Sequence, residues 1–267
     1  MRRVMALLQK ELIDLSRNPA VFVPAVLTAV VSICLPFLIA VVLPAVTGEP
    51  LTGSSDFRVA IDALRGTAVA AGLDGEGLIQ AWILRQFVVL LVLTPVAASM
   101  ASAAYSVVGE KQARTLEPLL TTPLTTAELL AAKVLGSLLP ATVLTIACFG
   151  VYVAAAAAFA REGVYATLLT GQPLATVFVL GPLAALAALQ LAVCVSSRVN
   201  DARSAQQIGA LVILPVAGLL VAQLTGALQL SGTVIAATAL VLLSVNAGLA
   251  LLGVTLFDRE SILTRWK

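Results

Sequence analysis

The sequence predicts an all-α integral membrane protein with six transmembrane helices, built as one domain over residues 1–267. Of its 267 residues, 60% are hydrophobic and only 11% are charged, whereas an average soluble domain has about 25% charged residues. The few charges are gathered in short segments that separate long uncharged stretches. These stretches are long enough for membrane spans, because a helix crosses about 30 Å of hydrocarbon with roughly 20 residues.

The uncharged stretches set the limits of the predicted spans. They are residues 18–48, 86–109, 134–160, 163–197 and 204–257. The last stretch would be about 80 Å long as a single helix, so we expect it to turn back at "TGALQLSG", residues Thr225–Gly232. The six predicted spans are therefore about 20–46, 82–108, 134–160, 173–197, 205–226 and 232–256.

Residues 1–18 precede the first span and predict an amphipathic helix that lies in the membrane interface. Met5, Leu8, Leu12 and Leu15 recur at helical spacing, and the charged side chains lie largely elsewhere, a pattern typical of interfacial helices. Pro19 separates this helix from the first span. A soluble helical tail is the alternative interpretation.

The distribution of lysine and arginine predicts the orientation of the chain. An even number of spans puts both termini on one side of the membrane. Of the 16 Lys and Arg residues, 12 lie in the N-terminal segment, in residues 110–133 and 198–203, or in the C-terminal tail. Because cytoplasmic segments carry an excess of positive charge, we expect a multi-pass protein of the cytoplasmic membrane with both termini in the cytoplasm.

The connection between the second and third predicted spans, residues 109–133, carries clear helix signals. Glu110 and Arg114 are spaced to pair on one helix, and Pro118 either ends that helix or opens a new one. Thr125 and Glu128 fit a capping box for a helix that continues into the third span. The sequence thus predicts a compact folded connection that buries its leucines, either against the chain's own spans or against a partner.

This connection resembles the signature of ABC-2-type transporter permeases, the membrane subunits of ATP-driven ABC exporters. The family pattern is an acidic residue, a spacer, T-L-E-x-L-L-x-[ST]-P-x-[ST]-x-x-E, and a Gly-Lys pair near the next span. The matching positions are Glu110, Thr115, Leu116, Glu117, Leu119, Leu120, Thr122, Pro123, Thr125, Glu128 and Lys133. The chain departs from the pattern at Arg114, where glycine is frequent, and at Ala132, which replaces the glycine of the Gly-Lys pair. The segments "KELIDLSRNP" and "SSRVNDARSAQQIGAL" resemble the family's N-terminal helix and second cytoplasmic loop.

The resemblance implies that residues 109–133, including Arg114 and the matching positions, form a coupling helix that sits in a groove of an ATPase subunit. The chain itself is expected to hold no catalytic residue, metal or cofactor. None of its lysines follows a glycine, so the phosphate-binding GxxxxGK[ST] motif is absent. The implied partners are two copies of an ABC ATPase subunit that bind ATP and Mg, a second permease copy or a paralogue, and membrane lipid. A net charge of +2 is too small to indicate a nucleic-acid partner.

Polar residues within the spans are candidates for lining a transport path. They are Arg85, Gln190 and Asn246. Arg85 lies near the outer end of the second span, where it can instead extend its head group to the interface. Hydrogen bonds between helices explain Gln190 and Asn246 equally well. The spans also contain prolines that are expected to kink helices, namely Pro24, Pro36, Pro44, Pro95, Pro140, Pro182 and Pro215.

Composition narrows the function classes. The chain has no histidine, which excludes Ser–His and Cys–His nucleophile pairs and HExxH zinc sites. No acidic residue lies in the middle of a span, and ion-coupled transporters usually keep one there. The predicted function is the permease subunit of an ABC exporter, driven by a separate ATPase. The alternatives are an ATP-independent secondary transporter or channel, or a membrane anchor that does not transport.

Overall fold

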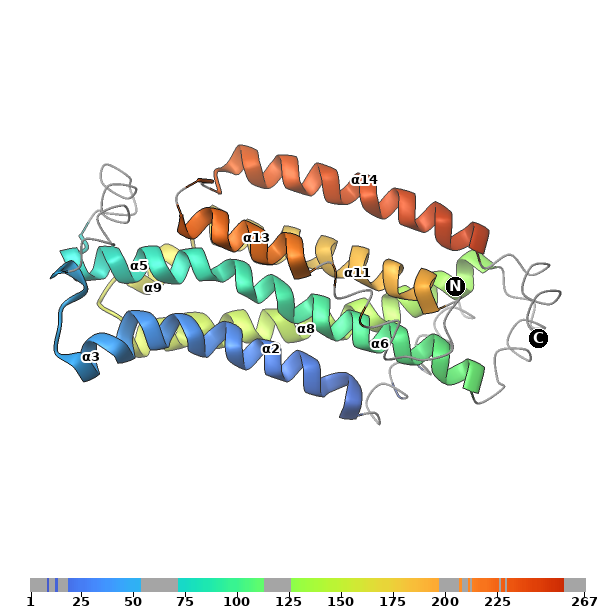
Figure 1. Ribbon diagram of the computed structural model, residues 1–267, viewed down its shortest axis with the longest axis horizontal. Helices are drawn as coiled ribbons and strands as arrows, with labels where there is room; N and C mark the ends of the chain where they lie inside the picture. Colours follow the sequence, from blue (N-terminus) through green and yellow to red (C-terminus); the bar gives the residue numbers. More distant parts are fainter. Residues whose placement is uncertain are drawn as a thin grey trace.

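The computed structural model describes residues 9, 13, 19–53, 72–112, 126–196, 207, 211, 213–225, 227–228 and 230–256. Every regular element in these ranges is helical, and the long helices lie side by side in one elongated bundle (Figure 1). The predicted interfacial helix over residues 1–18 lies almost wholly outside the described residues.

The first two predicted spans are composite helices. The first consists of α2 (Pro19–Phe37), the π-helical segment η1 (Leu38–Val42) and α3 (Leu43–Thr47). It is followed by the short 3₁₀ turn η2 (Leu51–Gly53). The second consists of α5 (Gly75–Phe87), the 3₁₀ segment η5 (Val88–Val92) and α6 (Leu93–Gln112). The second span begins earlier than predicted because Asp74 caps it, accepting a hydrogen bond from Gly77 N at 2.7 Å.

Of the remaining spans, the third and the last are each one unbroken helix, and the fourth is built from shorter segments. The third is α8 (Thr126–Phe159), which starts one residue after the predicted cap Thr125 and continues through Lys133 into the span. The short helices α9 (Val164–Leu168) and α10 (Gly171–Ala175) lead to the π-helical segment η6 (Thr176–Leu180) and to α11 (Gly181–Ser196). The last two helices in the described ranges are α13 (Ile213–Leu224) and α14 (Gly232–Leu256).

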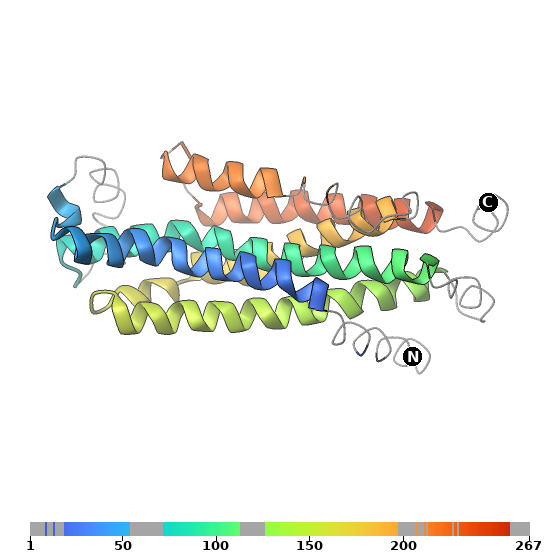
Figure 2. The same cartoon turned by 60° about the horizontal axis from the view of Figure 1, so that its bottom comes forward.

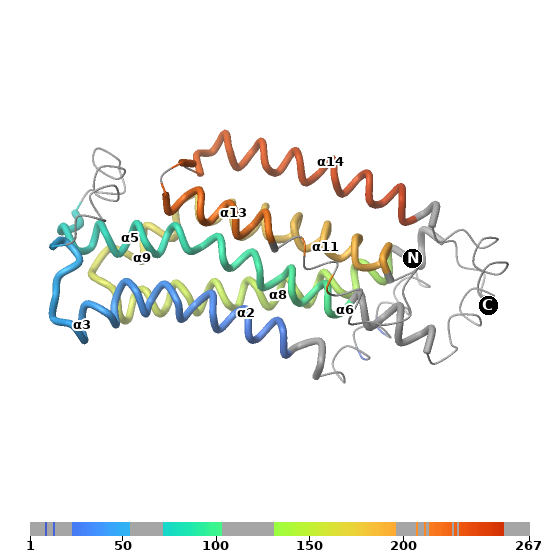
Figure 3. The backbone as a smooth tube through the Cα atoms, in the orientation of Figure 1, coloured from blue at the N-terminus to red at the C-terminus, as the bar shows by residue number. Residues whose placement is uncertain are grey.

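Five of these helical runs are long and apolar enough to cross a membrane. They cover Val23–Thr47, Gly75–Ser102, Ala131–Phe159, Gly171–Val195 and Gly232–Gly253. The predicted fifth span, 205–226, is represented by a shorter apolar helix over Leu214–Leu224, because most of residues 205–212 lie outside the described ranges. Figure 1 shows that the start of α2 and the end of α14 lie toward the same end of the bundle, and the tube in Figure 3 follows the same course of the helices.

Proline accounts for the irregular segments of three spans. Proline has no N–H, and its ring clashes with the carbonyl of the residue four positions earlier. For Pro44, Pro95 and Pro182 that carbonyl belongs to Ala40, Leu91 and Phe178, which lie within η1, η5 and η6 respectively. The backbone therefore adopts a π or 3₁₀ turn just before each of these prolines. By contrast, Pro24, Pro36 and Pro140 lie inside continuous α-helix.

The second and fourth spans form the centre of the bundle. In the second span 78% of the crossing segment is buried within the protein, and in the fourth 56%, against 22% in the first, 28% in the third and 11% in the last. Helix α6 packs against α2, α8 and α11, and α11 also packs against α14. In the second view, α8 lies along one side of the bundle while α13 and α14 lie along the other (Figure 2).

Candidate functional site

The predicted coupling connection falls between α6 and α8 in the sequence, and the end of α6 and the start of α8 lie toward the same end of the bundle as the start of α2 (Figure 1). Glu110 falls within α6 and Glu128 within α8. The other predicted coupling residues, except Lys133, lie outside the described residues; they are Arg114, Thr115, Leu116, Glu117, Leu119, Leu120, Thr122, Pro123 and Thr125. The two helices that flank the connection are joined by a 2.7 Å hydrogen bond between the hydroxyls of Ser102 and Ser137, both almost fully buried.

Lys133 is the one predicted coupling residue whose side chain the structure describes. It is 2% exposed and ranks among the largest fully buried side chains. The neighbouring Ala132, which stands where the family pattern has glycine, is completely buried. The start of the third span is therefore tightly packed despite the extra methyl group. Lys133 therefore does not present its charge on an open surface.

Arg85 lies on α5 and fastens the connection between the third and fourth spans. Its Nη1 donates to the carbonyl of Thr167 at 3.4 Å and to Oγ1 of Thr170 at 3.2 Å. Its Nη2 donates to Oε1 of Gln172 at 2.6 Å. The guanidinium is thus bonded within the protein, through α9 and α10, and holds these short helices against the second span.

Gln190 and Asn246 connect the fourth span to the last one. Gln190 Nε2 donates to Asn246 Oδ1 at 3.3 Å. Asn246 Nδ2 donates to the carbonyls of Leu183 at 3.0 Å and Leu242 at 2.8 Å. The structure therefore contains the interhelical bonds that the sequence offered as one explanation of these two residues.

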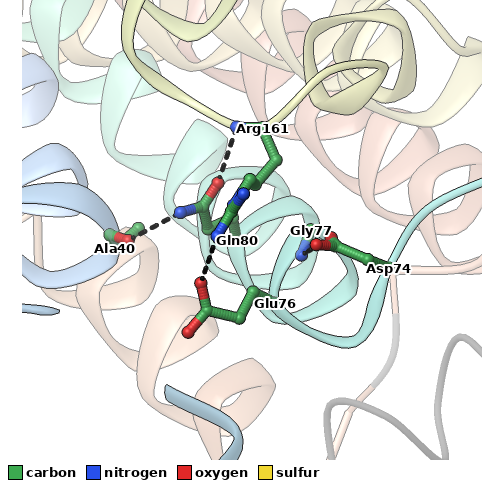
Figure 4. Close-up of polar contacts among 6 residues, drawn as sticks. All are labelled: Ala40, Asp74, Glu76, Gly77, Gln80 and Arg161. Carbon is green, nitrogen blue, oxygen red and sulfur yellow. Dashed lines mark hydrogen bonds and ion pairs between the residues drawn. The ribbon is translucent and has the colours of Figure 1, made fainter. Parts of the chain in front are cut away.

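A polar cluster at the opposite end of the bundle was not predicted (Figure 4). Gln80 is 7% exposed, and its Nε2 donates to the carbonyl of Ala40 at 3.2 Å. Its Oε1 accepts from the backbone N–H of Arg161 at 2.9 Å. The side chain of Arg161 forms a 3.1 Å ion pair with Glu76. One amide therefore ties together the first, second and third spans, and it satisfies the carbonyl that Pro44 leaves without its helical partner.

The only sequence signal for Gln80 was a polar residue just before the predicted start of the second span. Its partners are two backbone groups far away in the chain. Backbone groups carry no residue-specific signal, so the sequence could not indicate this arrangement.

Comparison with known proteins places the chain in a family context. Residues 5–235 match the family described as "ABC-2 family transporter protein". No curated protein matches the chain. The matched range includes the first four spans, the connection between α6 and α8, and helix α13.

Proposed function

Because the chain belongs to the ABC-2 transporter family, we propose that it is the permease subunit of an ABC exporter, which moves its substrate outward using ATP hydrolysed by a separate ATPase. The chain is a multi-pass membrane protein and a transport component rather than a catalyst. The observation that carries the finer proposal is the connection between α6 and α8, where the family signature falls between two membrane helices that lie side by side.

The ATPase is proposed to be another polypeptide. This sequence has no GxxxxGK[ST] motif, so it cannot cradle ATP phosphates in that way. ATP and Mg would be bound by the partner, in two copies, beside a second permease copy or a paralogue. The excess of positive charge around residues 110–133 and both termini supports a cytoplasmic location for this end.

The geometry of α8 supports transmission of motion from the connection to the spans. Helix α8 runs for 34 residues from Thr126 to Phe159, which corresponds to about 50 Å at 1.5 Å per residue. Its first turns are fixed by the buried Lys133 and by the bond of Ser137 to Ser102. A displacement of the connection would therefore move the second and third spans together.

The proposed roles follow from residue chemistry. Leu116, Leu119 and Leu120 would pack in a groove of the ATPase, since burial of apolar surface is the main contribution to association. The charged residues Glu110, Arg114 and Glu117 would orient the contact. Thr125 and Glu128 would cap α8, and Thr122 with Pro123 would form the turn before it.

The proposal is tested by affinity purification of the tagged chain from its native membrane, followed by mass spectrometry. We expect a stoichiometric soluble protein with a GxxxxGK[ST] motif. Glu117→Arg combined with Leu120→Asp should leave the chain inserted but abolish the association, because it reverses one charge and places another in the apolar contact. The control is Glu162→Arg, the same charge reversal at an exposed position at the opposite end.

Two outcomes would contradict the proposal. If the double variant retained both ATPase association and transport, the assignment of residues 109–133 as the coupling element would be wrong. If no ATPase accompanied the unaltered chain, under conditions where a known ABC complex stays intact, an ATP-independent transporter or an anchor subunit would replace the proposal.

A further inference from the structure

The second and fourth spans run parallel and keep a nearly constant register. Toward the outer end, Arg85 bonds to Thr170 and Gln172, which lie 85 and 87 residues later in the chain. Toward the other end, Ser99 Oγ donates to the carbonyl of Ala185, which lies 86 residues later. The two central helices are thus aligned residue by residue, and the features of one can be compared directly with those of the other at the same depth.

The helical breaks of these two spans meet at one depth. The 3₁₀ segment η5 packs against the π segment η6. A Cβ atom built on Gly181 would lie 3.8 Å from Cγ of Pro95. Pro95 and Pro182 therefore lie at nearly the same depth in the two most buried spans, each two or three residues after the end of a segment that departs from α-helical geometry.

Prolines of the first and third spans lie at nearly the same depth. Ser32 Oγ donates to the carbonyl of Leu90, which aligns the first span with the second. Pro24 lies eight residues, about 12 Å, before Ser32, and Pro95 lies five residues, about 7.5 Å, after Leu90. Because the two spans are antiparallel, both prolines lie on the same side of this bond, and their depths differ by about 5 Å. The Ser102–Ser137 bond aligns the third span with the second. On this antiparallel pair the depth of Pro140 differs from that of Pro95 by about 6 Å, roughly one helical turn. We call Pro24, Pro95, Pro140 and Pro182 the proline belt.

Side-chain bonds fasten the spans on either side of η5 and η6. Toward the outer end, the bonds of Gln80 to Ala40 and Arg161, of Arg85 to α9 and α10, and of Tyr152 to Leu84 hold the outer parts of the first spans and the α9–α10 connection together. Toward the other end, the Ser99, Ser102 and Asn246 bonds hold α6, α8, α11 and α14 together. These bonds therefore gather into two groups with η5 and η6 between them, and the Ser99 bond lies level with Pro140.

Thr94, directly before Pro95, has a buried hydroxyl without a hydrogen-bond partner. Its side chain is 0% exposed, and Oγ1 makes no bond within the described part of the chain. A buried polar atom left unbonded is costly and rare in folded proteins. A threonine in a helix can bond the carbonyl three or four residues earlier, which for Thr94 belongs to Leu91 or Leu90 in η5. The Leu90 carbonyl already accepts from Ser32 Oγ, whereas Pro95 has no N–H to offer the Leu91 carbonyl. The hydroxyl would gain a partner if η5 rearranged so that the Leu91 carbonyl turned toward it.

We propose that the proline belt is a hinge across the first four spans, about which the outer half of the bundle bends against the other half, with the backbone of η5 and η6 absorbing the change. Hinges form where a few residues absorb the backbone change between two well-packed bodies. The hinge would serve the transport cycle and in that sense rests on the proposed function. The bending itself is a property of this chain and can be measured without transport.

The test uses pairs of spin labels on the full-length chain in lipid nanodiscs, with Cys34, Cys148 and Cys194 replaced by alanine. One pair crosses the belt, at Leu135 and Leu169, which are both exposed. Two control pairs lie within one half each, Val46 with Leu169 and Leu135 with Leu251, at positions that are likewise exposed. Distances are measured by double electron–electron resonance on the chain alone, and on the chain with its ATPase with and without ATP.

We expect a broader distance distribution for the crossing pair than for either control pair, with a second, shifted population. Pro95→Ala combined with Pro182→Ala should narrow the distribution to the control width. A crossing pair as narrow as the controls, or a width that the double variant leaves unchanged, would overturn the hinge.

Thr94 provides a second variant pair for the case in which the proline variants do not fold. Thr94→Val removes the hydroxyl with little change of shape and should deplete the shifted population, while Thr94→Ser should keep it. Equal behaviour of the two variants would count against the hinge. If no ATPase accompanies the chain, the proposed function fails, but the distributions of the chain alone still decide on the hinge.

Discussion

The second and last spans have similarly apolar sequences but opposite surroundings. In the second span 78% of the crossing segment is buried within the protein, and in the last only 11%. Leu84 in the second is completely buried, whereas Leu251 in the last is 71% exposed. This difference shows that the apolar sequence of a span indicates only that the helix is not surrounded by water. Whether lipid or protein covers it depends on small residues and a few polar contacts that fix the packing.

The largest expected effect on stability is the difference between substituting Leu84 and substituting Leu251. Leu84→Ala should destabilise the folded chain by about 3 kcal/mol, because it leaves a cavity in a packed core. Leu251→Ala, the matched change on the exposed face, should alter stability by less than about 0.5 kcal/mol. Thermal unfolding in one detergent, followed by circular dichroism, measures both. Equal losses would show that the last span is as closely packed as the second, for example against a second copy.

A smaller effect on stability is expected at Tyr152, where a substitution tests one hydrogen bond within the buried core. Tyr152 is completely buried, and its hydroxyl donates to the carbonyl of Leu84 at 2.8 Å. Tyr152→Phe removes the hydroxyl but keeps the edge-on ring contact with Phe37. It should cost about 1–2 kcal/mol, because the buried carbonyl loses a partner. The same melting assay tests this value, with Tyr165→Phe as the control on an exposed side chain.

Asn246 is one of the few buried residues of the last span, since it is only 6% exposed. Asn246→Leu should cost about 1 kcal/mol, the usual size of an interhelical polar bond in a membrane. It should also loosen α14 from α11, which limited proteolysis of the tagged C-terminus can detect. Ser244→Leu, on an exposed side chain of the same helix, serves as control. A neutral result for Asn246→Leu would mean that apolar packing alone holds the last span.

The smallest effect is expected for the ion pair between Arg161 and Glu76. The Arg161 side chain is 57% exposed, and exposed ion pairs contribute about 0–1 kcal/mol. Arg161→Ala should therefore lower the melting temperature only slightly, and the loss should shrink further at high salt. The backbone N–H of Arg161 would still bond Gln80, so Gln80→Leu should be clearly more damaging. The reverse order would contradict the role of Gln80.

Much of the fold could be predicted from the placement of charges. The gap from residue 134 to 160 predicted the third span, and the structure places a candidate span at Ala131–Phe159. The second span was predicted to begin at residue 82 but begins at Gly75. Glu76 and Arg85 interrupted the uncharged pattern there, although both have partners within the protein, Arg161 for the first and α9 and α10 for the second. The distribution of charges indicates which segments can face lipid. It does not reveal polar residues within a span whose hydrogen-bond or ion-pair partners are supplied by the protein itself.

The candidate sites also differ in how far the sequence alone could predict them. The residues 109–133 were recognisable because their motif is local in sequence, and their contacts remain a prediction. Gln80, and the meeting of Pro95 with Gly181, depend on the register between distant spans. A single sequence carries no direct measure of that register, because many alignments of two apolar helices bury similar surface.

The bond of Gln80 to the Ala40 carbonyl also has a consequence for how the chain is made. The first span is synthesised before the second, and Pro44 leaves that carbonyl without its own helical donor. Until Gln80 arrives, the carbonyl in the newly made first span lacks this donor, and an acceptor left unbonded in hydrocarbon is costly. Ser32 shows the reverse case, in which a donor in the first span bonds to an acceptor, the Leu90 carbonyl, in the second span. We therefore expect the ribosome to deliver these two spans into the bilayer as a hairpin, with neither surrounded by lipid alone.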